Sequence, residues 1–251
     1  MSSWSQKRRL IYLSIAAIVA VGAVGLPLFL RFYKPPSCFD GVKNGNEQGV
    51  DCGGSCQKLC PDAFIPARAD WVRFEKMAPG VYNLAAYIVN PNVAGGAHDV
   101  PFHIVLFDSS GVPISDVSGT VTIPPHRNTL AFIPNVDVKK SVPIKAIFEF
   151  TAPPDWTSET DPLGALSISD LNYTEGASGS SFQATLSNSS VQPIGPLEVY
   201  AVLYDKDHNA VGFSKTIVDQ VPPGGSAVAP FTWPIDRNGA VISQEVLPVA
   251  E

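Results

Sequence analysis

Four cysteines are the residues whose type and spacing point most directly to a chemistry. Cys38, Cys52, Cys56 and Cys60 lie within 23 residues, in a segment with few apolar side chains of its own. An even, clustered set of cysteines in an exported segment is typical of disulfide bonds, which stabilise regions too small to hold a core. We therefore predict two disulfides, and the sequence leaves three pairings open. Zinc is the rival interpretation, but the segment lacks paired CxxC elements and a nearby histidine.

The same segment offers oxygen ligands of the kind that calcium prefers, from Asp40, Asn44, Glu47 and Asp51. The twelve residues 40–51 have the length of an EF-hand loop, with Gly45 at the sixth position. However, Val42 stands where a ligand belongs, and the twelfth residue is not Glu. A cluster of Gly/Asn turns with solvated acids explains the pattern better, so calcium is an open alternative and no other cofactor is expected.

Residues 38–60 also resemble a short cysteine module, C-x-DG-x-x-NG-x-E-x-x-x-DCGG-x-C, of bacterial cell-surface proteins. The resemblance implies a location at the cell surface. It implies no activity.

An uncharged stretch, residues 10–30, precedes the cysteines and is long enough for a helix of about 30 Å, the thickness of a bilayer core. We predict a transmembrane helix over residues 10–31 that contacts the lipid bilayer, with residues 1–9 as a short cytoplasmic tail. Three basic residues precede the stretch and two follow it, which favours a single-pass protein of a bacterial-type cytoplasmic membrane with its C-terminal part outside. A cleaved signal peptide is the alternative.

The part beyond residue 34 carries 12 basic and all 23 acidic residues, a net charge of about −11. Such a surface repels phosphate backbones, so nucleic acid is not an expected partner.

An internal repeat organises the rest of the chain. Four landmarks recur at offsets of 97 to 99 residues: Asn90 and Asn188, Asp108 and Asp205, Pro125 and Pro223, Phe132 and Phe231. The runs between them are short, aromatic and β-branched, and they end in turn residues, as strands do. We predict an all-β ectodomain of two tandem immunoglobulin-like β-sandwiches, over residues 66–152 and 164–251. The cysteine-rich module covers residues 32–62, and the proline-rich residues 153–163 form a linker.

The second copy contains Leu203-Tyr204-Asp205 and, further on, Pro223-Gly224-Gly225-Ser226; the first contains Leu106-Phe107-Asp108. These runs resemble the FxLYD-type domain of bacterial and archaeal envelope proteins. The leading Phe of that motif is absent from both copies, so the match is partial. The resemblance implies a sandwich fold and export, and the family has no general activity.

No catalytic motif is recognisable, and the four histidines are scattered along the chain. We therefore expect a protein that is not an enzyme, whose sandwiches serve as an interaction or display module for a protein or glycan. A structural subunit of a membrane-associated envelope assembly is the alternative.

A binding surface is predicted from side-chain alternation in residues 199–204, where Tyr200, Val202 and Tyr204 share one face. This face carries polar tips, so we place it away from the inter-sheet core, and we expect Tyr200 and Tyr204 to contact a partner. The alternative is that a neighbouring loop or the sister domain covers this face.

Overall fold

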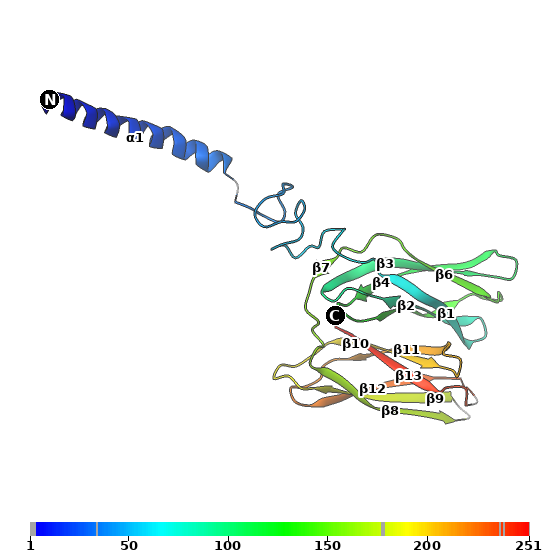
Figure 1. Ribbon diagram of the computed structural model, residues 1–251. Helices are drawn as coiled ribbons and strands as arrows, with labels where there is room; N and C mark the ends of the chain where they lie inside the picture. Colours follow the sequence, from blue (N-terminus) through cyan, green and yellow to red (C-terminus); the bar gives the residue numbers. More distant parts are fainter. Residues whose placement is uncertain (1–3, 34, 177–178, 236, 238, 251) are drawn as a thin grey trace. The chain divides into compact units, whose positions relative to one another are not determined.

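The computed structural model describes residues 4–33, 35–176, 179–235, 237 and 239–250 (Figure 1). The chain divides into two compact units, residues 1–56 and residues 57–251, and each is considered by itself.

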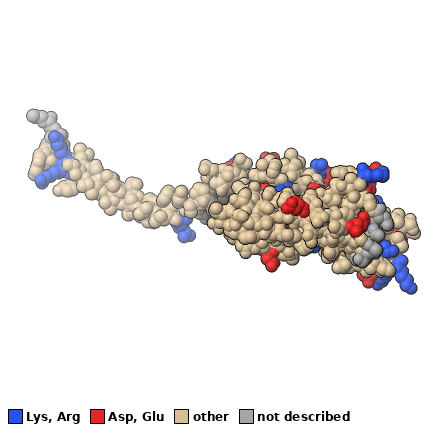
Figure 2. Space-filling model, turned by 90° about the horizontal axis from the view of Figure 1, so that it is seen from below, with Lys and Arg blue, Asp and Glu red and all other residues tan. Residues whose placement is uncertain are grey.

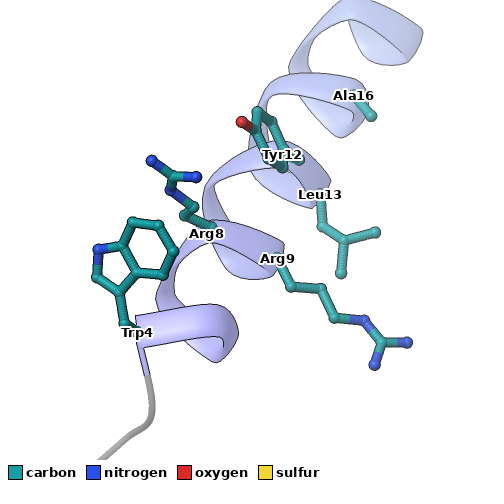
Figure 3. Close-up of a pocket in the computed structure, with 6 residues that line it drawn as sticks. All are labelled: Trp4, Arg8, Arg9, Tyr12, Leu13 and Ala16. Carbon is teal, nitrogen blue, oxygen red and sulfur yellow. The ribbon is translucent and has the colours of Figure 1, made fainter.

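The first unit begins with one helix, α1 (Trp4–Phe32), whose residues Gln6–Phe32 are long and apolar enough to cross a membrane. A signal sequence would show the same properties. The surface of this helix is uncharged between basic side chains at its two ends (Figure 2). At the start of the helix, the Arg8 guanidinium lies 3.8 Å from the centre of the Trp4 ring (Figure 3), a contact between residues one turn apart that suits a membrane–water interface.

The second unit is built from four sheets that form two pairs. The N-terminal sheet pair has one sheet in the order β1-β2-β5 and another in the order β4-β3-β6. The strands are β1 (Arg68–Ala78), β2 (Val81–Val89), β3 (Gly95–Phe107), β4 (Pro113–Ile123), β5 (Thr129–Asp137) and β6 (Lys145–Phe150). Alternate residues of the central strands are fully buried between the two sheets, among them Leu84 and Ile88 of β2 and Phe102 and Ile104 of β3. This shared core holds the two layers together (Figure 1).

The C-terminal sheet pair repeats this arrangement, with sheets in the orders β12-β9-β8 and β11-β10-β13. Its strands are β8 (Leu166–Gly176), β9 (Gly179–Asn188), β10 (Leu197–Tyr204), β11 (Ala210–Val218), β12 (Ser226–Trp233) and β13 (Ser243–Ala250). Phe182, Leu186, Val199 and Leu203 are fully buried in its core. Each strand of one pair has a counterpart with the same neighbours in the other, so the repeat in the sequence corresponds to a repeat in topology.

The landmark asparagines have the same structural role in both pairs. Asn90 is buried, and its side-chain amide donates to the carbonyls of Gly95 (2.8 Å) and Pro124 (2.7 Å). Asn188 makes the matching bonds to the carbonyls of Gln192 (2.7 Å) and Val221 (3.2 Å). Each side chain therefore fastens the end of one strand to two other segments, which few residue types of this size can do.

The landmark aspartates close equivalent turns after β3 and β10. Asp205 accepts hydrogen bonds from the backbone amides of Asp207 (2.9 Å) and Asn209 (2.8 Å), and Asp108 does the same for residues 110 and 112. The amide of Asn209 is the main reason that the pKa of Asp205 is lowered.

The segment predicted as a linker is packed in the structure. Trp156 is buried in the N-terminal core, and β7 (Thr157–Ser158) pairs with Gly95 and Gly96 of β3. Leu163 is buried in the C-terminal core. Apolar side chains at both ends of the segment therefore fasten it to the sheets.

Candidate functional site

The cysteines form disulfides, as predicted. Cys38 pairs with Cys56, Cys52 and Cys60 are also disulfide-bonded, and none of the four cysteines, all of which the structure describes, is free. The compact first unit ends at Cys56, earlier than the predicted module boundary at residue 62. Leu59 packs instead against the N-terminal core, and its amide donates to the carbonyl of Trp156 (2.9 Å).

The carboxylates of the predicted calcium loop face backbone amides. Asp51 accepts from the amides of Asp40 (3.0 Å) and Gly41 (2.9 Å). Glu47 accepts from the amides of Asn44 (3.1 Å) and Asp51 (3.3 Å), and Asp40 accepts from the side chain of Asn44 (2.8 Å). This pattern is that of acidic turns, in which carboxylates close tight loops.

The calcium site of this loop stays a prediction. Within the described residues, the carboxylates of Asp40, Glu47 and Asp51 do not converge into one cluster; Glu47 groups instead with Cys38 and Cys56. Those two sulfurs are joined in a disulfide and cannot act as thiolate ligands.

A third apolar cluster lies between the two sheet pairs, and we call it the seam. It joins the sheet β1-β2-β5 to the sheet β11-β10-β13 and contains Ala85, Tyr87, Leu130, Tyr200, Val202, Tyr204, Phe213, Leu247 and Val249. The sequence encodes it by making β2 and β10 apolar on both faces: one set of alternate residues enters a core within a sheet pair and the other set enters the seam.

Tyr200 and Tyr204 lie in this seam and not on an open surface. They are 5% and 7% exposed, because the N-terminal sheet pair covers them. This burial agrees with the alternative given in the sequence analysis, in which the other half of the repeat covers the face that carries Tyr200 and Tyr204. Neither side chain is open to an outside partner in this structure.

A half-buried carboxylate accepts hydrogen bonds from two tyrosines of the seam. Glu245 of β13 accepts one hydrogen bond from the hydroxyl of Tyr87 and one from the hydroxyl of Tyr204, each of 2.7 Å. Asn128 donates to the Tyr87 oxygen (3.0 Å). Burial, reinforced by the charge of Glu245, raises the pKa of both tyrosines well above their usual value. Both phenols therefore stay neutral donors, and their hydroxyls are satisfied within the seam.

A buried ion pair joins the sheet pairs at a second point. Glu75 of β1 pairs with Arg237, and each side chain is only 7% exposed. The other oxygen of Glu75 accepts from the amide of Phe213 on β11 (3.2 Å). Burial raises the pKa of Glu75, although Arg237 and the Phe213 amide act in the opposite direction. Sequence reasoning missed this pair, because its members are 162 residues apart.

Gly212 is the local feature that makes room for Arg237. A β-carbon at this position would collide with the Arg237 guanidinium. The glycine in β11 thus allows the close approach of a charged side chain, a known reason for glycine inside strands.

At one edge of the seam lies a polar pocket lined by Tyr200 together with His98, Asp99, Glu198 and Lys215. Glu198 accepts hydrogen bonds from both Tyr200 and Lys215. The Glu198 charge is thus compensated within the protein.

The four histidines lie at separate places. His98 contacts Glu159, His103 lies beside Asp116 and Glu149, and His208 stacks on Tyr204; His126 is in a turn with a left-handed backbone. None of these contacts joins a histidine to a serine, threonine or cysteine side chain.

Exposed apolar residues lie in the loops next to the end of β3, and the sequence analysis did not single them out. Val112, Val142 and Ile144 are 53%, 65% and 62% exposed. Phe107 pairs with Pro113, which follows Val112, and with Lys145, and its carbonyl accepts a hydrogen bond from the Ile144 amide (2.9 Å). Val142 lies two residues before Ile144. We call Phe107, Val112, Val142 and Ile144 the apolar rim. Exposed apolar side chains that gather in loops mark contact surfaces more often than single ones do.

Comparison with known proteins adds little to these observations. No protein-family model matches the chain, and no curated protein matches it. Among solved structures it is similar to the crystal structure of a putative beta-galactosidase from Bacteroides fragilis, at 11% identity and a TM-score of 0.21. The match covers 69% of this chain and 33% of that one, so the chain spans about a third of that protein's length. A likeness this weak says nothing about the activity of this chain.

Proposed function

We propose that this chain is a single-pass membrane protein that displays a rigid, non-catalytic pair of immunoglobulin-like β-sandwiches on the outer side of the cell membrane. Helix α1 is the anchor, and each sheet pair is one sandwich. The observation that carries this proposal is the seam: nine buried residues from both sheet pairs form one continuous cluster, so the second unit moves as one body.

Rigid display suits a protein that presents a surface to a partner at a fixed geometry. Because the tyrosines are covered, we place the partner surface at the apolar rim. The exposed members of the rim are aliphatic, which favours a protein partner over a glycan. A permanent subunit of an envelope assembly would use the same rim, but its complex would not dissociate.

The orientation can be tested with a membrane-impermeant thiol reagent applied to intact cells after reduction. We expect labelling of the four cysteines without lysis. Labelling that requires lysis would reverse the orientation and remove the outer-side display.

The partner surface can be tested with a photo-crosslinking amino acid in the full chain in cells. We expect a discrete crosslinked protein with the probe at Ile144 and none with the probe at Val191, which is 87% exposed but lies in a different loop. Equal crosslinking from both positions, or from neither, would contradict the rim as a partner surface. A crosslinked partner that co-purifies in fixed ratio would favour the envelope subunit.

A further inference from the structure

Two segments of the C-terminal sheet pair match the acceptor pattern for N-linked glycans, Asn-x-Ser/Thr. They are Asn172-Tyr173-Thr174 and Asn188-Ser189-Ser190. A short pattern of this kind says little alone. The structure, however, places the two asparagines in opposite environments.

The side chain of Asn188 is buried and takes part in the hydrogen bonds of the fold. It is 2% exposed, and both hydrogen bonds of its amide nitrogen go to backbone carbonyls. Its carbonyl oxygen accepts from the amide of Ser190 (2.8 Å). A sugar on this nitrogen would remove one of the donors and would have to enter the interior, so the folded chain cannot accept it.

Asn172, in contrast, is exposed. It lies on β8, the edge strand of the sheet β12-β9-β8, where residues 167–172 are all exposed. A bulge between Ser169 and Asn172, with Asp170 in a left-handed conformation, interrupts the pairing just before it. Bulged edge strands bend away from the sheet and pair weakly, which leaves this backbone accessible to an enzyme.

The hydroxyl at the third position of the pattern is also accessible. Thr174 is exposed, and its side chain contacts that of Ser181 (2.7 Å) at the surface of the sheet. Water or an enzyme group can replace that contact at little cost.

The surrounding sheet face is suited to a glycan. Many of its outward residues are uncharged and polar, among them Ser167, Thr174, Ser181, Gln183, Thr185 and Thr232, and they lie beside the exposed apolar Val228. Figure 2 looks from the side on which β8 lies in Figure 1 and shows a surface with few charged side chains. The corresponding sheet of the N-terminal pair, β1-β2-β5, is covered by the seam, whereas outward residues of this one, such as Gln183 and Thr232, are exposed. A neutral, hydrogen-bonding sugar would cover it without leaving a charge unpaired.

We propose that Asn172 is an N-glycosylation site and that Asn188 is protected by the fold. In the glycosyl-transfer step, the Asn172 amide nitrogen attacks the anomeric carbon of a lipid-pyrophosphate-linked oligosaccharide. The N–C bond forms, the C–O bond to the pyrophosphate breaks with its electron pair, and the nitrogen gives one proton to the transferase. This inference rests on the proposed export, because such transferases act on the outer side of the membrane.

The test uses the purified full chain in detergent, a purified oligosaccharyltransferase that needs only Asn-x-Ser/Thr, and its lipid-linked oligosaccharide. Mass spectrometry of glycopeptides should find the sugar on Asn172 alone. Thr174→Ala should abolish it, Thr174→Ser should retain it, and Ser190→Ala should leave it unchanged. The reduced and unfolded chain should be modified at both asparagines, which would show that the fold protects Asn188. A folded chain that is unmodified at Asn172, or modified at Asn188, overturns the assignment and leaves the proposed function standing.

A second arm separates this inference from the proposed function. The full chain is produced in cells that carry the same transferase on the outer side of the membrane, and export is scored by the impermeant thiol reagent. An exported chain with the sugar on Asn172 supports the site, and an exported chain without it overturns the site alone. A chain that is not exported overturns the proposed function and, with it, modification in cells.

Discussion

The hydroxyl of Tyr87 on β2 donates a 2.7 Å hydrogen bond to Glu245 on β13 and so joins one sheet pair to the other. The same carboxylate accepts the hydroxyl of Tyr204 through its second oxygen. One charged group thus satisfies two phenols inside an otherwise apolar seam. Charge-assisted bonds of this kind are strong, and their loss leaves buried donors without partners.

We predict that Glu245→Ala lowers the free energy of unfolding by about 2–4 kcal/mol, since two buried hydroxyls lose their acceptor at once. Urea denaturation followed by tryptophan fluorescence measures this change. Glu149→Ala is the matched control: Glu149 is on β6, its side chain is 69% exposed, and its removal should cost less than about 0.5 kcal/mol. Similar losses in the two variants would show that the seam carboxylate contributes no more than a surface one.

The tyrosines of the seam should resist alkaline titration. Burial raises the pKa of Tyr87 and Tyr204 in the folded state. The stability that these tyrosines contribute is therefore complete below their pKa in the unfolded chain, about 10, and it declines as the pH rises above that pKa. We expect the absorbance of tyrosinate to show these two groups ionising only together with unfolding. In Tyr87→Phe and Tyr204→Phe, the amplitude of that unfolding-linked step should fall by one tyrosine each. Ionisation of both groups near pH 10 in a folded chain would contradict their burial.

The sequence was sufficient to identify the repeat, the strands and the two faces of β10, because alternation and turn residues are local signals. It also placed Tyr204 on the face away from the core of its own sheet pair. It did not identify what covers that face, since Tyr87 and Leu130 come from another part of the chain and from strands that are also apolar on both faces. Whether such a face is open or covered is decided by tertiary packing, which a single sequence does not encode locally.

Gly212→Ala should disrupt the second polar contact between the sheet pairs. The added β-carbon pushes the Arg237 guanidinium away from Glu75 and weakens the buried pair, which we expect to cost about 1–3 kcal/mol. Gly164→Ala is the control, because a β-carbon there meets its nearest atom, the Asp161 carbonyl oxygen, at an ordinary 3.7 Å. Thermal unfolding of the two variants measures the difference. Equal melting temperatures would show that Arg237 relocates without loss.

Glu75 should make stability depend on pH in the acidic range. Burial raises the pKa of Glu75 in the folded state, so the folded chain holds its proton at a pH at which the unfolded chain has lost it. The contribution of Glu75 to the free energy of unfolding is therefore complete below its pKa in the unfolded chain, about 4.3. This contribution is lost as the pH rises through its pKa in the folded chain. We expect Glu75→Gln to gain stability relative to the native chain as the pH rises across this range, as measured by urea denaturation at several pH values. A constant difference between the two proteins would mean that Arg237 fully offsets the burial.

The acidic loop of the cysteine segment shows where residue types alone leave two interpretations open. The spacing of Asp40, Glu47 and Asp51 allows either a calcium loop or a set of turns, and only the direction of each carboxylate separates the two. In the structure, Asp51 accepts two backbone amides, an arrangement that needs no ion.

We therefore predict that Asp51, and not calcium, orders this loop. Asp51→Asn keeps the size of the side chain and tolerates the left-handed backbone at this position, but one acceptor oxygen becomes a donor that faces a backbone N–H. The amides of Asp40 and Gly41 should then exchange with deuterium faster, by roughly tenfold for a loss of about 1.4 kcal/mol. Asp62→Asn, at an exposed turn, is the control and should leave these amides unchanged. Addition of calcium should give no heat in calorimetry and should not restore protection in the variant. Calcium-dependent protection of Asp40 and Gly41 in the native chain, reversed by a chelator, would instead establish the calcium loop.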